Sequence, residues 1–414
     1  MQEANKIMQE ANKIMQEANT TTQTIEYLYR NRHATRVGLH KYLHVTPAAV
    51  SKLIKQLIDD HIVIETGQQI SQKEGAGRSK KIISLSKQIG NYIGVSFNMA
   101  GLALVLTTIY GEIINKIFIN YNEMKKYDLN QLIINNLKLI ISQNPNAKPL
   151  GVGFAIPGHY DAKQYKLVSN NQMWQNFDLE TIQEQINLPM LAENNVESMA
   201  DAHYLFSNDL SKKGNFIFFH IGYGIYSAFI EPGNLHPKRN YSVGEVGHTI
   251  IDPNGFKCEC GKKGCLQTYS SHTWLLKRAR AFYDLSENTV LHQLVSDKSK
   301  ITFDTLLAAY KLNDPYTADM LDTSIKYLGI IISNLLMVYD ADVIYLNGFI
   351  VQIPEFKDKL LKFISDQLKF INSQKQTKIE VLSKDKYRGA IGGCALVALS
   401  QVIKNPNYQE ITLK

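Results

Sequence analysis

The sequence has few cysteines and no long uninterrupted apolar run. Four cysteines among 414 residues are too few for the disulfide framework of a small secreted protein. No apolar run approaches the roughly 20 residues that span a bilayer, and the N-terminus lacks the basic and then apolar order of a secretory signal. We therefore expect a cytoplasmic globular protein with no membrane contact.

The net charge of +7 is modest, but it is distributed unevenly. Residues 20–90 carry 11 Lys and Arg against five Asp and Glu, so nearly all of the positive surplus lies in the first fifth of the chain. A local surplus of this kind attracts a polyanion. The whole chain is 44% hydrophobic and 20% charged, which is typical of a folded protein rather than a disordered one.

The first 19 residues consist of the heptad MQEANKI, present twice and followed by MQEAN. The repeat is compatible with a helix, but two and a half heptads are too short for a stable coiled coil on their own. We interpret residues 1–19 as a helical N-terminal extension. A contribution to dimerisation is the alternative interpretation.

Residues 20–88 have the pattern of three helices followed by two strands. Thr46 suits the N-cap of the third helix, and Pro47 suits its first turn. Strand-like runs at residues 62–64 and 81–85 flank a polar loop, and this order predicts a winged helix-turn-helix DNA-binding domain. Apolar residues recur at helical spacing at Ile25, Leu28 and Tyr29 in the first helix, at Val37, Leu39 and Leu43 in the second, and at Ala49, Val50, Leu53, Ile54 and Leu57 in the third.

The third helix carries hydroxyl, small and basic side chains opposite its apolar face. Side chains of these types suit the major groove of operator DNA and its phosphates. The polar loop adds a basic segment in which we expect Arg78 to enter the minor groove. The alternative for a lysine-rich hairpin is a solvated edge. The expected contacts on the third helix are Thr46, Ala48, Ser51, Lys52, Lys55 and Gln56.

Residues 89–414 contain two α/β halves of similar order. The halves predict the duplicated architecture of sugar kinases and actin, with lobe one at about 89–200 plus the C-terminal helix and lobe two at about 201–385. We expect a ligand cleft between the lobes and Cys394 in the core. The strand-like runs are 92–97, 102–108, 112–119, 150–156, 215–221, 225–230 and 343–346, and the clearest helical runs are 129–142 and 318–339.

Three closely spaced cysteines, Cys258, Cys260 and Cys265, follow the segment Gly-Glu-Val-Gly-His that ends at His248. One imidazole and three thiolates provide the four ligands that tetrahedral zinc prefers. Because these residues would fill every coordination position, we predict a structural rather than a hydrolytic zinc. The alternative is three unpaired cysteines and a hydrogen-bonded histidine.

The segment 244–267 resembles the glycine-rich sugar and zinc signature of the ROK family (repressors, open reading frames, kinases). Residues 169–174 are similar to the family's Asn-to-Trp sugar loop, residues 193–196 are similar to its Asn-Asp-Ala motif, and the resemblance covers nearly the whole chain. It implies a two-lobed, ribonuclease H-like domain of the actin and sugar-kinase type. It also implies a monosaccharide bound by Asn170, Asn194, Asn195, Glu245, His248 and Gln267.

The resemblance also assigns roles to these residues. It implies that Glu245 accepts protons from sugar hydroxyls, and that His248 binds zinc with one ring nitrogen and a hydroxyl with the other. Gln267 stands where the family usually has a glutamate, which keeps the hydrogen-bonding reach but removes the charge.

Three departures from the family's kinases affect the nucleotide side. Asn195 stands where those kinases place an aspartate, and an amide cannot accept the proton of a sugar hydroxyl. Residues 96–100 read Ser-Phe-Asn-Met-Ala instead of Asp-x-Gly-Gly-Thr, and Tyr226 follows the turn at 222–224 where small residues are usual. These losses predict a protein that binds sugar without phosphorylating it and is not an enzyme.

The N-terminal domain and the resemblance together indicate the xylose-repressor branch of the ROK family. We expect a repressor of carbohydrate-utilisation genes that binds a palindromic operator as a homodimer or homotetramer, and is associated with the nucleoid when bound. A monosaccharide effector would shift it between operator-competent and incompetent arrangements. Two alternatives are a ROK sugar kinase with a fused DNA-binding domain and a repressor controlled by a partner protein.

Overall fold

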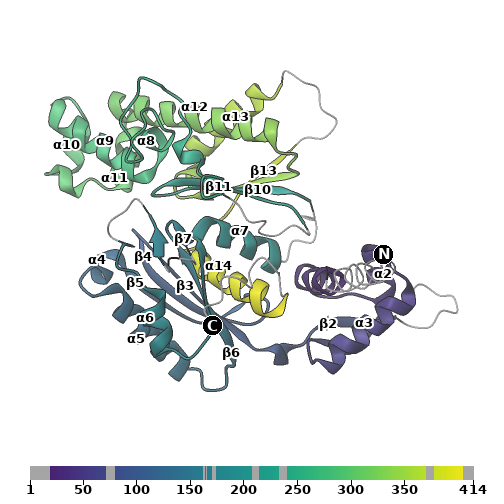
Figure 1. Ribbon diagram of the computed structural model, residues 1–414. Helices are drawn as coiled ribbons and strands as arrows, with labels where there is room; N and C mark the ends of the chain where they lie inside the picture. The colour runs from purple at the N-terminus through teal and green to yellow at the C-terminus, as the bar shows by residue number, and fades with distance from the viewer. Residues whose placement is uncertain are drawn as a thin grey trace, which may run out of the picture. The chain divides into compact units, whose positions relative to one another are not determined.

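A computed structural model of the chain describes residues 19–70, 80–161, 164, 166–169, 174–207, 214–232, 240–369 and 377–403. The described residues divide into two compact units (Figure 1). The first contains residues 19–207 and 386–403, and the second contains residues 214–232 and 240–385. The heptad repeat up to residue 18, Arg78 and Asn170 lie outside the described residues.

The N-terminal domain has the three helices and two antiparallel strands that the sequence predicts, which confirms the winged helix-turn-helix. The Thr46 hydroxyl caps the third helix by accepting a hydrogen bond from the backbone N–H of Ala49 at 3.3 Å. The elements are the N-terminal helix at residues 19–31, α2 (Arg36–Leu43), α3 (Pro47–Asp59), β1 (Val63–Ile70) and β2 (Lys80–Leu85).

One ion pair ties α2 to the hairpin, and a second ion pair joins the two strands of the hairpin. The Glu65 carboxylate in β1 lies 2.6 Å from Arg36 in α2 and 2.6 Å from Lys81 in β2. The hydrogen bonds from Lys81 and Arg36 lower the pKa of Glu65. The ion pairs therefore fix the start of α2 against both strands.

Helix α3 is amphipathic, as predicted, with Val50, Ile54 and Leu57 buried. Ala49 is exposed rather than part of this apolar face. Ala49 points away from the buried face because it lies about 100° of helix rotation from its buried neighbour Val50.

The first α/β sheet has the strand order β5-β4-β3-β6-β9. Strand β3 pairs antiparallel with β4 and parallel with β6, and β6 pairs parallel with β9. The strands are β3 (Asn91–Asn98), β4 (Gly101–Thr107), β5 (Ile113–Asn120), β6 (Pro149–Ile156) and β9 (Met190–Asn194). The other elements are η1 (Lys87–Ile89), α4 (Tyr121–Met124), α5 (Leu129–Ser142), the hairpin β7 (His159–Asp161) and β8 (Lys166–Val168), α6 (Leu179–Gln185) and α7 (Asn195–Phe206).

Helices cover both faces of this sheet. Residues in a strand alternate between its two faces, so neighbouring residues of β3 contact different helices. Ile93 and Val95 pack with residues of α5 and α6 in one core. Gly94 faces α14 (Arg388–Val397), where a Cβ atom would lie 1.7 Å from the carbonyl oxygen of Ala390. Helix α14 therefore rests directly on the sheet, and the π-helical turn Ala398–Val402 follows it. Cys394 in α14 is buried, which confirms it as a core residue.

Helix α7 lies wholly within the first unit, so the division between the units falls after Phe206 rather than near residue 201. It packs closely on α14, since a Cβ atom at Gly392 would lie 2.8 Å from the backbone of Ser198. The C-terminal part of α7 contacts the N-terminal domain. The carbonyl oxygen of Phe206 accepts a hydrogen bond from the Arg32 guanidinium at 2.8 Å.

The second unit is a four-stranded sheet with the order β11-β10-β12-β13 and a layer of helices. Its β10 pairs antiparallel with β11 and parallel with β12. The strands are β10 (Phe216–Ile221), β11 (Ile225–Ile230), β12 (Val343–Gly348) and β13 (Lys378–Val381). The helices are η3 (Val246–His248), α8 (Gln267–Ser270), α9 (His272–Leu285), α10 (Leu291–Leu294), η4 (Lys298–Lys300), α11 (Phe303–Lys311), α12 (Pro315–Val338), η5 (Ile350–Gln352) and α13 (Pro354–Gln367).

Helix α12 is the one helix in the described part of the chain that is long and apolar enough to cross a membrane by length and composition. Its buried residues, among them Met320, Leu328 and Ile332, belong to the hydrophobic core of the second unit. They pack there with residues of the sheet and of α13, which is the arrangement of a core helix in a folded domain.

Candidate functional site

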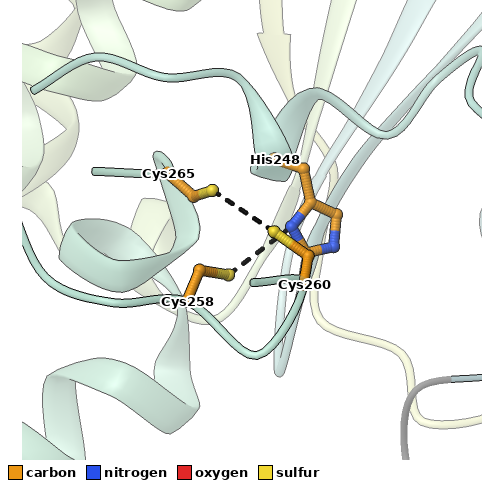
Figure 2. Close-up of side chains that lie close together, drawn as sticks. All are labelled: His248, Cys258, Cys260 and Cys265. Carbon is orange, nitrogen blue, oxygen red and sulfur yellow. Dashed lines mark hydrogen bonds between the residues drawn. The ribbon is translucent and has the colours of Figure 1, made fainter. Parts of the chain in front are cut away.

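Four metal-ligating side chains converge in the second unit, as Figure 2 shows. Their ligand atoms all lie within 4.8 Å of one another. His248 Nδ1 lies 3.6 Å from Cys258 Sγ, and the Sγ atoms of Cys260 and Cys265 are also 3.6 Å apart. Around a tetrahedral ion with bonds of about 2.0–2.3 Å, neighbouring ligand atoms lie roughly 3.5–3.8 Å apart. The arrangement therefore fits a four-coordinate metal centre.

Glycines shape the loop that carries the cysteines. Gly261 and Gly264 have φ values of 89° and 70°, in the left-handed region that favours glycine. A Cβ atom at Gly264 would lie 1.5 Å from the carbonyl oxygen of Asp252. The Cys258 N–H also donates to the Lys262 carbonyl at 2.8 Å, so the backbone itself closes the turn around the thiols.

Burial shifts the pKa of three of these ligands, whereas at Cys260 the effect of burial is outweighed by hydrogen bonds from the Lys262 backbone and the neighbouring thiols, which lower the pKa. Burial raises the pKa of the Cys265 thiol to about 12, with contributions from the neighbouring cysteines, and it raises the pKa of Cys258. Burial lowers the pKa of His248, which favours its neutral form. Metal binding to these thiols therefore requires their protons to leave, and the neutral imidazole is ready to act as a ligand.

A polar cluster lies beside the thiol of Cys258. The Gln267 side-chain N–H₂ donates to Cys258 Sγ and to Glu259 Oε2, each at 3.3 Å. The indole N–H of Trp274, in α9, also donates to Glu259 Oε2 at 3.2 Å. Burial alone would raise the pKa of Glu259, but hydrogen bonds from the backbone, Trp274, Cys258 and Gln267 lower it. Neither Glu259 nor Trp274 belongs to a sequence motif that predicts a role in this site.

His248 links the cysteine cluster to Glu245. Its Nδ1 faces Cys258, while its Nε2 lies 3.9 Å from the Glu245 carboxylate. Tyr226 supports this loop, because its hydroxyl donates to the Val243 carbonyl at 2.8 Å. A Cβ atom at Gly244 would lie 2.4 Å from the Tyr226 ring. Tyr226, which the sequence marks as a departure in the preceding turn, therefore packs under the Gly-Glu-Val-Gly-His segment.

Asn194 and Asn195 stand at the start of α7, in the first unit. Asn194 is buried and caps the helix, since its Oδ1 accepts from the N–H of Val196 at 2.8 Å. Its amide N–H₂ donates to the Gly158 carbonyl at 3.1 Å. The Asn195 side chain is half-buried and has no hydrogen-bond partner within the described residues. Of the two, Asn195 has the side chain that is available to a ligand.

The turn between β3 and β4 lacks a carboxylate. Asn98 Oδ1 accepts a hydrogen bond from the backbone N–H of Ala100 at 2.7 Å, which closes the turn. Phe97 is fully buried, with its ring centroid 5.3 Å from that of Trp174 and 5.0 Å from that of Phe177. This turn therefore offers an amide and apolar rings rather than an acidic group that could hold magnesium.

The candidate DNA-contact residues of the described chain share one exposed face of α3 and its cap. The Ser51 hydroxyl donates to the Pro47 carbonyl at 2.9 Å, so its oxygen remains available as an acceptor. The exposed residues are Thr46, Ala48, Ser51, Lys52, Lys55 and Gln56.

Comparisons with known proteins agree on one family. Residues 92–399 match the model of the ROK family. A xylose repressor of Caldicellulosiruptor bescii is 26% identical over 388 residues, which cover 91% of this chain and 94% of that protein. A glucokinase of Halalkalibacterium halodurans is 27% identical over 330 residues, covering 74% and 94%. The crystal structure of a ROK family transcriptional regulator, a homologue of the E. coli MLC protein, superimposes with a TM-score of 0.71 at 20% identity and covers 95% of this chain and 98% of that one.

Proposed function

Because the chain belongs to the ROK family, we propose that it is a transcriptional repressor whose DNA binding responds to a monosaccharide. The observation that carries the proposal is that a winged helix-turn-helix and an α/β lobe form one compact unit. A sugar kinase needs no such domain. The xylose repressor of Caldicellulosiruptor bescii matches 91% of this chain, whereas the glucokinase matches 74% of it.

In the proposed complex, α3 lies in the major groove of a palindromic operator. Lys52 and Lys55 contact phosphates, Thr46, Ala48 and Ser51 face base edges, and Arg78 reaches the minor groove. A homodimer or homotetramer places two such helices on successive half-sites. Exposure of the α3 residues supports this role.

The proposed metal is zinc, held by His248, Cys258, Cys260 and Cys265. The soft donor set and the 3.6 Å spacings support this choice. When bound, the ion cross-links the loop and holds it in shape. With all four ligands supplied by the protein, the site has a structural role rather than a hydrolytic one.

The residues proposed to contact the effector are six polar side chains. Asn170, Asn194 and Asn195 belong to the first part, and Glu245, His248 and Gln267 to the second. The free amide of Asn195 supports the assignment, and so does His248 Nε2, which lies 3.9 Å from Glu245 while Nδ1 faces Cys258. For Asn194 the buried cap geometry favours a role in presenting Asn195 to the sugar.

We propose that the protein does not transfer phosphate. Asn195 cannot accept the hydroxyl proton, and the β3–β4 turn holds Asn98 rather than an acid. Without an acidic group, this turn cannot supply the metal contact that phosphoryl transfer uses.

The test begins with DNA duplexes selected by the purified chain from a random library. Gel-shift titrations of the selected duplex are repeated with D-xylose, D-glucose and N-acetyl-D-glucosamine, each free and as its phosphate. We expect one of them to change operator affinity by about 5- to 150-fold. Absence of any selected duplex would contradict the proposal. DNA binding that ignores every sugar would instead favour control by a partner protein.

The second candidate function is sugar phosphorylation, which the glucokinase relative favours. A coupled assay with the same sugars and ATP–magnesium measures ADP formation. We expect no formation that depends on sugar, and a sugar-dependent rate above background would favour the kinase.

A further inference from the structure

The amide of Gln267 lies between two acceptors in the second unit. Its N–H₂ group donates to Cys258 Sγ and to Glu259 Oε2. We propose that Glu259 is a positioning residue that fixes the orientation of the Gln267 amide, so that its carbonyl oxygen is presented to the effector as an uncharged acceptor. This inference rests on the proposed function, since it defines the sugar that the site accepts.

In its protonated form the Cys258 thiol donates to Glu259 Oε2 at 3.5 Å. A metal-bound cysteine is a thiolate, so when the metal binds this donor is lost and both groups become acceptors that repel each other. A primary amide offers two N–H donors, one for each of these acceptors. Turning the amide over would place Gln267 Oε1 against both of them and would lose both hydrogen bonds. The neighbours therefore determine which end of the amide faces them.

Helix α9 holds Glu259 in this position. The Trp274 indole N–H donates to the same Oε2 atom at 3.2 Å. The Trp274 ring is itself covered by Lys277, whose Nζ lies 4.1 Å from the ring centroid. Glu259 is thus held by Trp274 of α9 as well as by Gln267 at the start of α8.

The opposite end of the amide faces two glycines. A Cβ atom at Gly247 would lie 3.3 Å from Gln267 Oε1, and one at Gly224 would lie 4.0 Å from it. These residues have no side chain to cover the oxygen. Gly247 also belongs to the segment that carries Glu245 and His248. The Gln267 oxygen is therefore placed beside the residues proposed to bind the sugar.

The orientation predicts the chemical class of the ligand. A group that meets Gln267 Oε1 must be a donor, such as a neutral sugar hydroxyl. A glutamate here would add a charge that attracts the ammonium of an amino sugar. It would also place a third anionic group beside Cys258 and Glu259. The chain therefore retains an acceptor at this position without the charge, and we expect it to attract the ammonium of a 2-amino-2-deoxy sugar less than a glutamate here would.

The test is a double-mutant cycle in the full-length, zinc-loaded chain. Gln267→Glu, Glu259→Gln and the double variant are compared by calorimetry with D-xylose, D-glucose and D-glucosamine, and bound zinc is measured in each. We expect Gln267→Glu to lose about tenfold or more in affinity for the neutral sugar that binds. Glu259→Gln in the same chain should restore most of that loss, because it removes the added repulsion. The double variant should also gain affinity for D-glucosamine relative to the wild type.

Gln293→Glu is the matched control, because it adds the same charge at an exposed position of α10. It should leave sugar affinity unchanged. A Gln267→Glu variant that binds as tightly as the wild type would overturn the inference, and so would a double variant no better than Gln267→Glu at equal zinc content.

A second readout separates this inference from the proposed function. If the wild type binds no sugar, the proposed function fails, and the amide orientation is then tested by the rate at which a chelator extracts zinc. We expect faster extraction from Gln267→Glu and recovery in the double variant, because the hydrogen bond to Cys258 stabilises the thiolate. Equal extraction rates in all four proteins would overturn the inference on their own.

Discussion

The hydroxyl of Tyr204, in α7, donates a hydrogen bond to the carboxylate of Glu26, in the N-terminal helix. Both side chains are buried, and the Arg30 guanidinium lies 4.3 Å from the centre of the Tyr204 ring and donates to its hydroxyl at 3.1 Å. The same α7 begins at Asn195, which we propose contacts the sugar. One helix thus connects that residue with the domain that carries α3.

We predict that Tyr204→Phe weakens the response of DNA binding to sugar. The change removes the hydroxyl that satisfies the buried Glu26 carboxylate, which should lower the free energy of unfolding by about 1–3 kcal/mol. The measurements are thermal unfolding and the ratio of operator affinities with and without sugar. Tyr283→Phe is the control, because it removes a hydroxyl that donates to the Val295 carbonyl in the second unit. A full sugar response in Tyr204→Phe would show that this contact does not couple the two functions.

We predict a loss of stability at alkaline pH from the tyrosines at the same junction. Burial raises the pKa of Tyr29, of Tyr92 and of Tyr204 above the ordinary value of 10.0. The unfolded chain therefore releases these protons first, and the stability present below pH 10 falls as the pH rises above it. Each tyrosine should remove up to about 1.4 kcal/mol per pH unit.

Denaturant unfolding between neutral pH and pH values above 10 measures this effect, and ultraviolet absorbance reports tyrosinate. Tyr29→Phe should give a shallower decline, because it removes one of the ionising groups. Ionisation of every tyrosine in the folded chain, without loss of stability, would contradict the prediction.

We predict that metal removal affects the second unit selectively. Chelation, or Cys260→Ser, should weaken sugar binding by about 10–100-fold, because His248 loses its fixed orientation. Binding of the selected duplex without sugar should persist, since α3 belongs to the first unit. Elemental analysis and the two binding assays test this. Cys394→Ala should keep its zinc, because Cys394 lies in α14 outside the cluster, and zinc loss in that variant would argue against the assigned ligands.

We predict that Lys52→Ala and Lys55→Ala weaken DNA binding through the phosphates. Each change should reduce the slope of log affinity against log salt by about one and weaken selected and unrelated duplexes alike. Lys311→Ala, an exposed lysine of α11 in the second unit, should leave the slope unchanged. A variant of α3 with the wild-type slope would show that its lysine does not contact a phosphate.

We predict that Asn195→Asp does not create a kinase. The aspartate would supply a base, but the β3–β4 turn would still contain Asn98 and the buried Phe97. Sugar-dependent ADP formation should stay at background in the coupled assay. Clear turnover by this variant would mean that the loss of one base separates this chain from its kinase relatives.

Local patterns in the sequence predicted the elements that depend on neighbouring residues. Thr46 and Pro47 marked the start of α3 because capping is a local interaction. The strand-like runs predicted β3, β4, β5 and β6 of the first sheet and β10, β11 and β12 of the second, but they did not predict β9 or β13. The close spacing of Cys258, Cys260 and Cys265 identified the cluster that the structure brings together with His248.

Contacts between distant residues could not be predicted in this way. Glu26 and Tyr204 are 178 positions apart, and nothing near either residue indicates the other. Trp274 is an ordinary aromatic residue of α9 until the fold places it against Glu259. Asn194 shows the converse, because its motif resemblance suggested a ligand contact while its side chain caps a helix.

The position of α14 near the end of the chain affects how the first unit folds during translation. The sheet that α14 covers is translated before the second unit, while α14 itself emerges only after residue 385. At ribosomal speeds of about 5–20 residues per second, the glycine-lined face of the nascent sheet stays uncovered for roughly 10–40 seconds. A ribosome that stalls within the second unit therefore releases a chain in which this face stays bare, and such fragments become substrates for chaperones and proteases.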